Sequence, residues 1–120
     1  MTPDELRASC LDLNDTAETF PFPRNPGLSA FKVSGKVFAF SALDETPLKV
    51  TLKCDPELAT NLRAAHPAIV PGYHTNKRHW NTVTLDGSLP DGMIRDMIED
   101  SHALVVATLP KAERLRLGHA

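Results

Sequence analysis

Apolar and polar residues alternate most regularly in the segment LKVTLKC, residues 48–54. The apolar positions are Leu48, Val50, Leu52 and Cys54, and the polar positions between them are Lys49, Thr51 and Lys53. Successive side chains of a strand point to opposite faces of a sheet, so this segment predicts a strand with one buried face and one basic face.

Two shorter segments with the same period precede it. Residues 31–33 and 37–43 are separated by the turn sequence SGK, which predicts a β-hairpin. The sequence DETP, residues 44–47, predicts a second turn that leads into the alternating segment. These three strands are therefore expected to pair in an antiparallel sheet.

The segment HWNTVTLD, residues 79–86, predicts a later strand of the same sheet. Its apolar alternates, Val83 and Leu85, are expected in the core, so Trp80 is expected on the opposite face. By the same rule the core also receives Phe31, Val33, Phe38, Phe40, Leu48, Val50 and Leu52. The face away from the core receives Lys32, Lys49, Thr51, Lys53, Thr82 and Thr84.

Helical spacing predicts a helix at the N-terminus. Thr2 is the expected N-cap, Pro3 the first helical residue and Glu5 the partner in a capping box. The buried face of this helix is expected to contain Leu6, Cys10 and Leu13. The segment FPFPRNPG, residues 20–27, ends the helix and forms an irregular connection.

Two further helices are predicted in the middle of the chain. One follows Asp55 and Pro56 and ends before Pro67. Its expected buried residues are Leu58, Leu62 and Ala65. The other has Ser88 as its N-cap and Asp91 at the capping-box position. Its apolar stripe contains Met93, Ile94, Met97 and Ile98.

A fourth, short helix is predicted to begin at Ser101 and to end before Pro110, followed by a partly frayed basic tail, residues 111–120. The order is then helix, three strands, helix, two strands and two helices. This order favours an α+β fold, a two-layer sandwich with an antiparallel sheet and helices packed on one face. We expect one domain, residues 1–120, whose second sheet face is open to solvent.

The overall composition is ordinary, but charged residues are distributed unevenly along the chain. The chain has 120 residues, 42% of them hydrophobic, and a formal net charge of -2 at pH 7, so a polyanion partner would require locally concentrated positive charge. Residues 21–54 contain five basic and two acidic side chains, and residues 69–81 contain two basic and none acidic. Residues 1–20 and 82–103 each contain five acidic and one basic. The predicted sheet is therefore positive and the first and third helices are negative, a pattern that also suits an ordinary solvated surface.

The cysteines and the apolar runs indicate the compartment. Cys10 and Cys54 lie in apolar patterns without C-x-x-C spacing, and the chain shows no secretory signal. We expect two reduced, structural thiols in a cytoplasmic protein. The longest apolar run, residues 103–107, is far shorter than the roughly 20 residues that span a bilayer.

Catalytic and metal-binding patterns are weak. His74 and His79 are five residues apart, which suits neither one face of a helix nor one face of a strand. Asp44 and Asp86 are the candidate carboxylate partners, and nothing in the sequence brings either close. No nucleophile-elbow, phosphate-loop or zincin motif is present. We therefore predict a binding protein without enzymatic activity, cofactor or metal.

Four segments together resemble the MmcQ/YjbR family of small bacterial proteins. They are FKVSGKVFA (residues 31–39), LKCDPELA (52–59), PGYHTNKRHWNTVTLDGS (71–88) and DSHALVVATLPK (100–111). The resemblance implies a fold similar to the frataxin-like CyaY sandwich, which agrees with the element order above. It also implies DNA binding.

If DNA is the partner, the open sheet face and the turn from Tyr73 to Trp80 are the expected interface. Its expected residues are Lys32, Lys49, Lys53, Tyr73, His74, Asn76, Lys77, Arg78, His79, Trp80, Asn81 and Thr82. The cations would neutralise phosphates, Trp80 and Tyr73 could stack on bases, and the amides could contact base edges. For Asn76 a structural role in the turn is favoured over a contact with a base, and Trp80 could be covered by the C-terminal tail. A protein or small-molecule ligand on the same surface is the alternative, and we expect a monomer.

Overall fold

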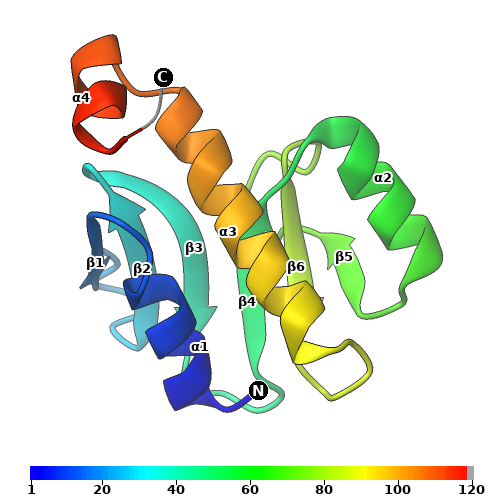
Figure 1. The fold of residues 1–120 in the computed structure, drawn as a ribbon. Helices are drawn as coiled ribbons and strands as arrows, with labels where there is room; N and C mark the ends of the chain where they lie inside the picture. Colours follow the sequence, from blue (N-terminus) through cyan, green and yellow to red (C-terminus); the bar gives the residue numbers. More distant parts are fainter. Residues whose placement is uncertain (119–120) are drawn as a thin grey trace.

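A computed structural model describes residues 1–118 and contains one six-stranded antiparallel sheet with strand order β1-β2-β3-β4-β6-β5 (Figure 1). The strands are β1 (Thr16–Thr19), β2 (Leu28–Val33), β3 (Lys36–Ala42), β4 (Lys49–Lys53), β5 (Ile69–Pro71) and β6 (Trp80–Thr84). The helices are α1 (Pro3–Leu11), α2 (Pro56–Ala65), α3 (Asp91–Ala107) and α4 (Lys111–Arg116).

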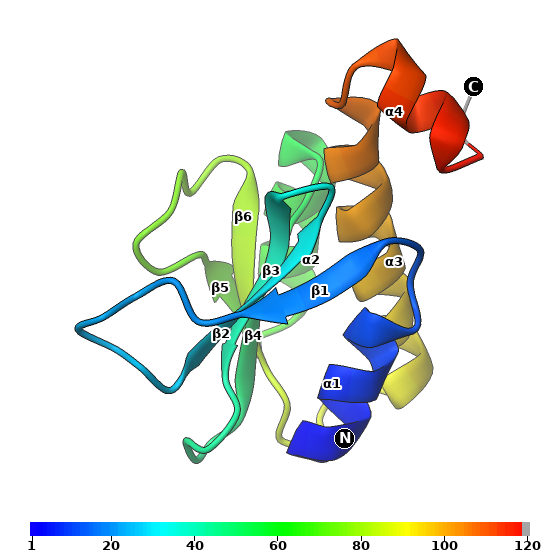
Figure 2. The same cartoon turned by 90° about the vertical axis from the view of Figure 1, so that its left-hand side faces the viewer.

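The helices cover one face of the sheet, and α3 runs across its centre (Figure 1). The connections between β1 and β2 and between β5 and β6 project from the other side (Figure 2). The predicted α+β two-layer sandwich is therefore confirmed. Its core lies between the sheet and the helices, where Phe31, Phe38, Val50, Val83 and Ile98 are almost completely buried. None of the helices in residues 1–118 is long and apolar enough to cross a membrane.

The N-terminal helix has the predicted start but ends earlier than expected. The Thr2 hydroxyl accepts the Glu5 backbone N–H and the Glu5 carboxylate accepts the Thr2 N–H, which forms the expected capping box. The helix ends at Leu11, and the chain then forms β1, an edge strand that the sequence pattern missed. Its sequence, TAET, has no apolar alternation, and Glu18 points to the helix side to pair with Arg7. A polar edge strand of this kind gives no period-two signal.

A β-bulge in β3 changes which side chains face the helices. Phe31 pairs with Ala39 and Lys32 pairs with Val37, so Phe38 is the extra residue of the bulge. Phe38 is fully buried against α3, where its ring lies 5.1 Å from that of His102. Beyond the bulge the alternation is shifted by one residue, so Ala39 joins the core. The prediction that Phe40 also fills this core is wrong, because Phe40 lies on the opposite sheet face.

The second helix buries a different stripe from the one expected. Ala59 is completely buried, Leu62 is partly buried, and Leu58 is 43% exposed; Ala65 is exposed as well. The predicted burial of Leu58 and Ala65 is wrong because α2 packs mainly on the edge strand β5. The small Ala59 side chain permits this close approach, and the residues on either side of it face solvent.

The third helix is one continuous element from Asp91 to Ala107, so the predicted break at Ser101 is wrong. Ser101 lies inside the helix and points at the sheet, where its hydroxyl donates to the Phe38 carbonyl at 2.6 Å and accepts the Lys53 backbone N–H at 2.8 Å. Ser88 is not the N-cap either, because Pro90 precedes the helix without a side-chain cap. The predicted apolar stripe is confirmed, with Ile94 and Ile98 buried and the two methionines partly buried.

The segment expected to fray instead contains α4. Arg116 pairs with Asp15 at 2.9 Å and with Glu113 at 2.8 Å, which ties this helix to the turn before β1. Leu117 is buried in the core. The last two residues of the predicted tail lie outside the described residues.

Candidate nucleic-acid interface

The sheet face opposite the helices, together with the two connections that flank it, is called the loop face here. It is formed by Ala30, Lys32, Val37, Phe40, Lys49, Thr51, Lys53, Val70, Trp80, Thr82, Thr84 and residues 20–27 and 72–79. The predicted alternation along β4 and β6 is confirmed, because Lys53 lies opposite Trp80 and Thr51 opposite Thr82 in the ladder. None of these positions is Asp or Glu.

Three aromatic rings form a row across the loop face. The ring centroids of Phe22 and Phe40 are 5.9 Å apart, and those of Phe40 and Trp80 are 5.7 Å apart, with interplanar angles of 46° and 52°. These spacings are typical of packed aromatic pairs. The row covers small side chains beneath it, and Ala30 is completely buried although it lies on this face. Trp80 therefore rests on Phe40.

Phe22 and Phe40 were absent from the predicted interface for two different reasons. Phe40 was assigned to the core because strict alternation from Phe38 ignores the bulge. Phe22 lies in a proline-rich segment that was interpreted only as a connection. Two phenylalanines among three prolines, at Phe20 and Phe22, were the available signal, since purely connecting segments rarely need large apolar side chains.

The lysines of the loop face have no carboxylate partner within the described residues. Every ion pair in residues 1–118 involves the N-terminal amine, Arg7 or Arg116, all of which lie on the helix side of the sheet. Lys49 instead lies over the Tyr73 ring, with Nζ 5.4 Å from the centroid, a cation–π contact. Lys32 and Lys53 are partly buried, as expected of lysines on a sheet surface.

The turn before β6 is held by its own polar side chains. Lys77 Nζ donates to the Gly72 carbonyl at 3.1 Å, and Thr75 donates to the same oxygen at 3.0 Å. The Asn76 side-chain oxygen accepts the Arg78 backbone N–H, so the structural role considered for Asn76 is confirmed. Gly72 packs so closely on the start of β6 that an added Cβ would lie 2.8 Å from the Trp80 Cβ. This contact fixes the turn against the aromatic row.

The two histidines of the turn differ in exposure. His74 is exposed and has a left-handed backbone, with φ of 57°. His79 is partly buried, and its backbone bonds to Asn76 and Cys54. Neither ring is hydrogen-bonded to a carboxylate among residues 1–118, and the same residues contain no cluster of three or more His, Cys, Asp or Glu side chains.

Two predicted interface residues are not available on the loop face. Asn81 is 2% exposed and faces the helices, so its predicted contact with base edges is wrong. The reason is parity, since Asn81 has the same orientation as Val83. Thr82 does lie on the loop face but is also 2% exposed; its hydroxyl bonds to Thr51 Oγ1 at 2.8 Å and accepts the Tyr73 N–H at 3.2 Å.

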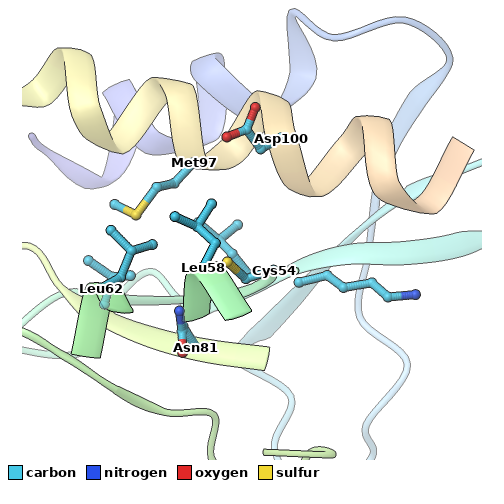
Figure 3. A pocket seen from close by; sticks show the side chains of 9 residues that line it. Cys54, Leu58, Leu62, Asn81, Met97 and Asp100 are labelled. Carbon is cyan, nitrogen blue, oxygen red and sulfur yellow. The ribbon is translucent and has the colours of Figure 1, made fainter. Parts of the chain in front are cut away.

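Asn81 instead lines a small recess between α2, α3 and the sheet (Figure 3). The recess is lined by Leu52, Lys53, Cys54, Leu58, Leu62, Asn81, Val83, Met97 and Asp100. Its cavity volume of about 20 Å³ has room for one water molecule. The Asn81 Oδ1 atom is buried without a protein partner.

Both cysteines are free, as predicted. Burial raises the pKa of the Cys10 thiol to about 12. Burial, reinforced by Asp55 and Asp100, also raises the pKa of the Cys54 thiol at the recess. Both thiols are therefore protonated and weakly nucleophilic at neutral pH.

The C-terminal segment does not cover Trp80 within the described residues. The side chains of residues 111–117 bond to Asp15, Ser34 and Leu109, at the end of the sheet where α4 lies (Figure 2). The contact that partly buries Trp80 comes from Phe40.

Residues 11–104 match the YjbR family model, and this chain belongs to the YjbR family. It is 43% identical over 83 residues to YjbR of Escherichia coli K12, covering 69% of this chain and 70% of that protein. It is 37% identical over 97 residues to YbdF of Escherichia coli O157:H7, covering 80% and 79%.

Two solved structures share the fold. The Deinococcus radiodurans protein DR2400 superposes with a TM-score of 0.91 at 42% identity, covering 99% of this chain and 89% of that one. A Pseudomonas syringae protein superposes with a TM-score of 0.76 at 33% identity, covering 87% and 98%.

Proposed function

We propose that this protein binds DNA through the loop face, weakly and mainly through phosphate contacts, and that it acts by binding rather than by catalysis. The observation that carries the proposal is the separation of charge. The loop face contains Arg24, Lys32, Lys49, Lys53, Lys77 and Arg78, no acidic residue, and no ion pair among the described residues. Unpaired cations of this kind are free to replace the counterions of a phosphate backbone.

The expected affinity follows from the number of cations. Six cations, spread over two connections and two strands, can make only a few phosphate contacts at once. Contacts of this type give dissociation constants of about 10⁻⁴ to 10⁻⁶ M at physiological salt, and the affinity falls steeply as salt rises. The net charge of -2 adds no long-range attraction beyond this local patch.

Fluorescence anisotropy of a labelled oligonucleotide, measured over a series of salt concentrations, tests the proposal. Lys77→Ala with Arg78→Ala should weaken binding and reduce the slope of log affinity against log salt by about 1 to 2, the loss of two phosphate contacts. Because Lys77 also bonds to Gly72, a second pair, Lys32→Ala with Lys53→Ala, repeats the test within the strands.

The matched control removes two cations from the helix side. Arg95 and Lys111 are both exposed and make no ion pair among residues 1–118, so Arg95→Ala with Lys111→Ala changes the net charge equally. This control should leave the slope unchanged. No binding at tens of micromolar protein in low salt, or equal losses in the control and the loop-face pairs, would refute the proposal.

A protein or small-molecule ligand on the same face is the second candidate. The observation that favours it is the exposure of Phe20 at 57% and Tyr73 at 56%, because large exposed aromatic side chains on flanking connections suit protein contacts. Binding of this kind would depend on Phe20 and Tyr73 and would show little dependence on salt.

A further inference from the structure

The aromatic row is a preformed surface for stacking. Phe22 comes from the connection before β2, Phe40 from β3 and Trp80 from β6, so three separate segments place their rings side by side across the sheet. Phe22 is 37% exposed, and the other two rings are partly exposed. Phe22 thus belongs to one of the flanking connections, and its ring lies beside those that β3 and β6 carry.

Several hydrogen-bonding groups of the same face are already engaged. The Asn76 side-chain oxygen accepts from Arg78, and the hydroxyls of Thr51 and Thr82 bond to each other. Thr82 also accepts the Tyr73 N–H, and Asn81 lies on the other side of the sheet. The face therefore offers cations and ring surfaces, while the Thr51 and Thr82 hydroxyls and the Asn76 oxygen are not free to bond the edges of base pairs.

The exposed rings and the engaged polar groups together favour single-stranded over double-stranded nucleic acid. In a duplex the base faces are stacked on one another, and only their edges are accessible in the grooves. An unpaired base exposes its face, which an aromatic side chain can stack on whatever the sequence. The helices of residues 1–118 lie on the opposite side of the sheet, so none of them extends from the loop face toward a major groove (Figure 2).

We propose that the loop face takes single-stranded nucleic acid in preference to duplex, with bases stacked on Phe22, Phe40 and Trp80 and phosphates neutralised by the flanking cations. This inference rests on the proposed nucleic-acid function. It adds that recognition uses base faces and is therefore insensitive to sequence.

The chain contains a single tryptophan, so its fluorescence reports directly on the platform. The probes are an oligodeoxythymidylate and a mixed-sequence duplex of equal length, titrated at low salt; an oligouridylate tests whether single-stranded RNA shares the site. The single strand should quench Trp80 fluorescence and bind about tenfold more tightly than the duplex, the effect of roughly one stacked base.

A pair of matched variants separates stacking from general apolar contact. Phe22→Ala removes one ring of the row and should weaken single-strand binding about fivefold, with the salt slope unchanged. Leu115 is an exposed apolar side chain of α4 and lies outside the loop face, so Leu115→Ala should change the affinity less than about twofold. Anisotropy of a labelled oligonucleotide measures both variants, and circular dichroism checks that they fold.

The outcomes separate this inference from the proposed function. If the duplex binds as tightly as the single strand, or if Leu115→Ala and Phe22→Ala lose affinity equally, the single-strand platform is wrong while DNA binding stands. If neither form binds at tens of micromolar protein, the proposed function is wrong and the platform is wrong with it.

Discussion

The same strands form both faces of the sheet, but one face is buried and the other is partly exposed. The helix face is closed by α1 and α3, and its side chains are almost entirely buried. On the loop face three aromatic rings and two connections cover the strands only in part, and the cations form no ion pair within the described residues. Stability is therefore concentrated on one face, which leaves the other free to carry exposed apolar and charged groups that contribute little to folding.

The bulge at Phe38 joins the two faces. The bulge turns Phe38 toward α3. Because the alternation is shifted after the bulge, Phe40 points to the opposite face and joins the aromatic row. The Ser101 hydroxyl bonds to the Phe38 carbonyl and to the Lys53 N–H, so a buried residue of α3 fixes the strand that carries Phe40 and the strand that carries Lys53. A contact on the helix side of the sheet thus holds the strands that form the loop face.

The largest contrast is expected between two phenylalanines on opposite faces. Phe38→Ala should lower the free energy of unfolding by about 3 to 5 kcal/mol, because it empties a fully buried site. Phe22→Ala, at a partly exposed ring, should cost less than about 1 kcal/mol. Urea denaturation followed by circular dichroism measures both. Similar losses at the two positions would show that the loop face is also part of the folding core.

Ser101→Ala is expected to destabilise the protein by about 2 to 4 kcal/mol, because it leaves a buried carbonyl and a buried N–H without a partner. Ser9→Ala is the control, since Ser9 is a helical serine bonded only to a carbonyl of its own helix, and should cost less than about 0.5 kcal/mol. Thermal and chemical unfolding of the two variants give the comparison. Equal effects would remove the linking role assigned to Ser101.

Asn81→Leu should raise the free energy of unfolding by about 1 kcal/mol, because it removes a buried amide oxygen that has no protein partner. The same variant should bind single-stranded DNA as the unsubstituted protein does, since Asn81 faces the helices. A loss of DNA affinity without a loss of stability would place Asn81 back on the binding surface and contradict the assignment of faces.

The smallest effect is expected at the exposed cluster of Arg116, Asp15 and Glu113. Hydrogen bonds from Arg116 hold the pKa values of Asp15 and Glu113 below their ordinary range. A lowered carboxylate pKa stabilises the folded state above the unfolded pKa of about 4, and this contribution is lost as pH falls through the folded value. Arg116→Ala should therefore be slightly less stable than the unsubstituted protein at pH 7 and equally stable in acid. A difference that grows on acidification would contradict this assignment.

The architecture was predictable from the sequence because most helices and strands show a local pattern of apolar and polar residues. The alternation in β4, the capping box of α1 and the apolar stripe of α3 depend on neighbouring residues alone, and all three are confirmed. Elements set by tertiary contacts were missed. β1 is a polar edge strand that pairs with β2, and α4 is fixed by contacts with Asp15, more than 90 residues earlier in the chain.

The candidate site was predictable as a surface but not in its details. Strand parity correctly placed Lys53 and Trp80 on one face. Strand parity failed at Phe40, because a bulge cannot be seen in an alternating pattern. The same rule, applied to Asn81, places that residue with Val83 on the core face. Phe22 could not be placed at all, since a proline-rich connection has no period that relates it to the sheet.

A nitrogen–proton NMR titration of the labelled protein with oligodeoxythymidylate tests the division between the two faces most directly. The backbone amides of the non-proline residues in 20–27, of residues 72–79, and of Phe40, Thr51 and Lys53 should shift with DNA concentration, together with the indole N–H of Trp80. The amides of α1, α4 and the exposed side of α3 should stay in place. Shifts concentrated on these helices, with the loop face unchanged, would contradict the account.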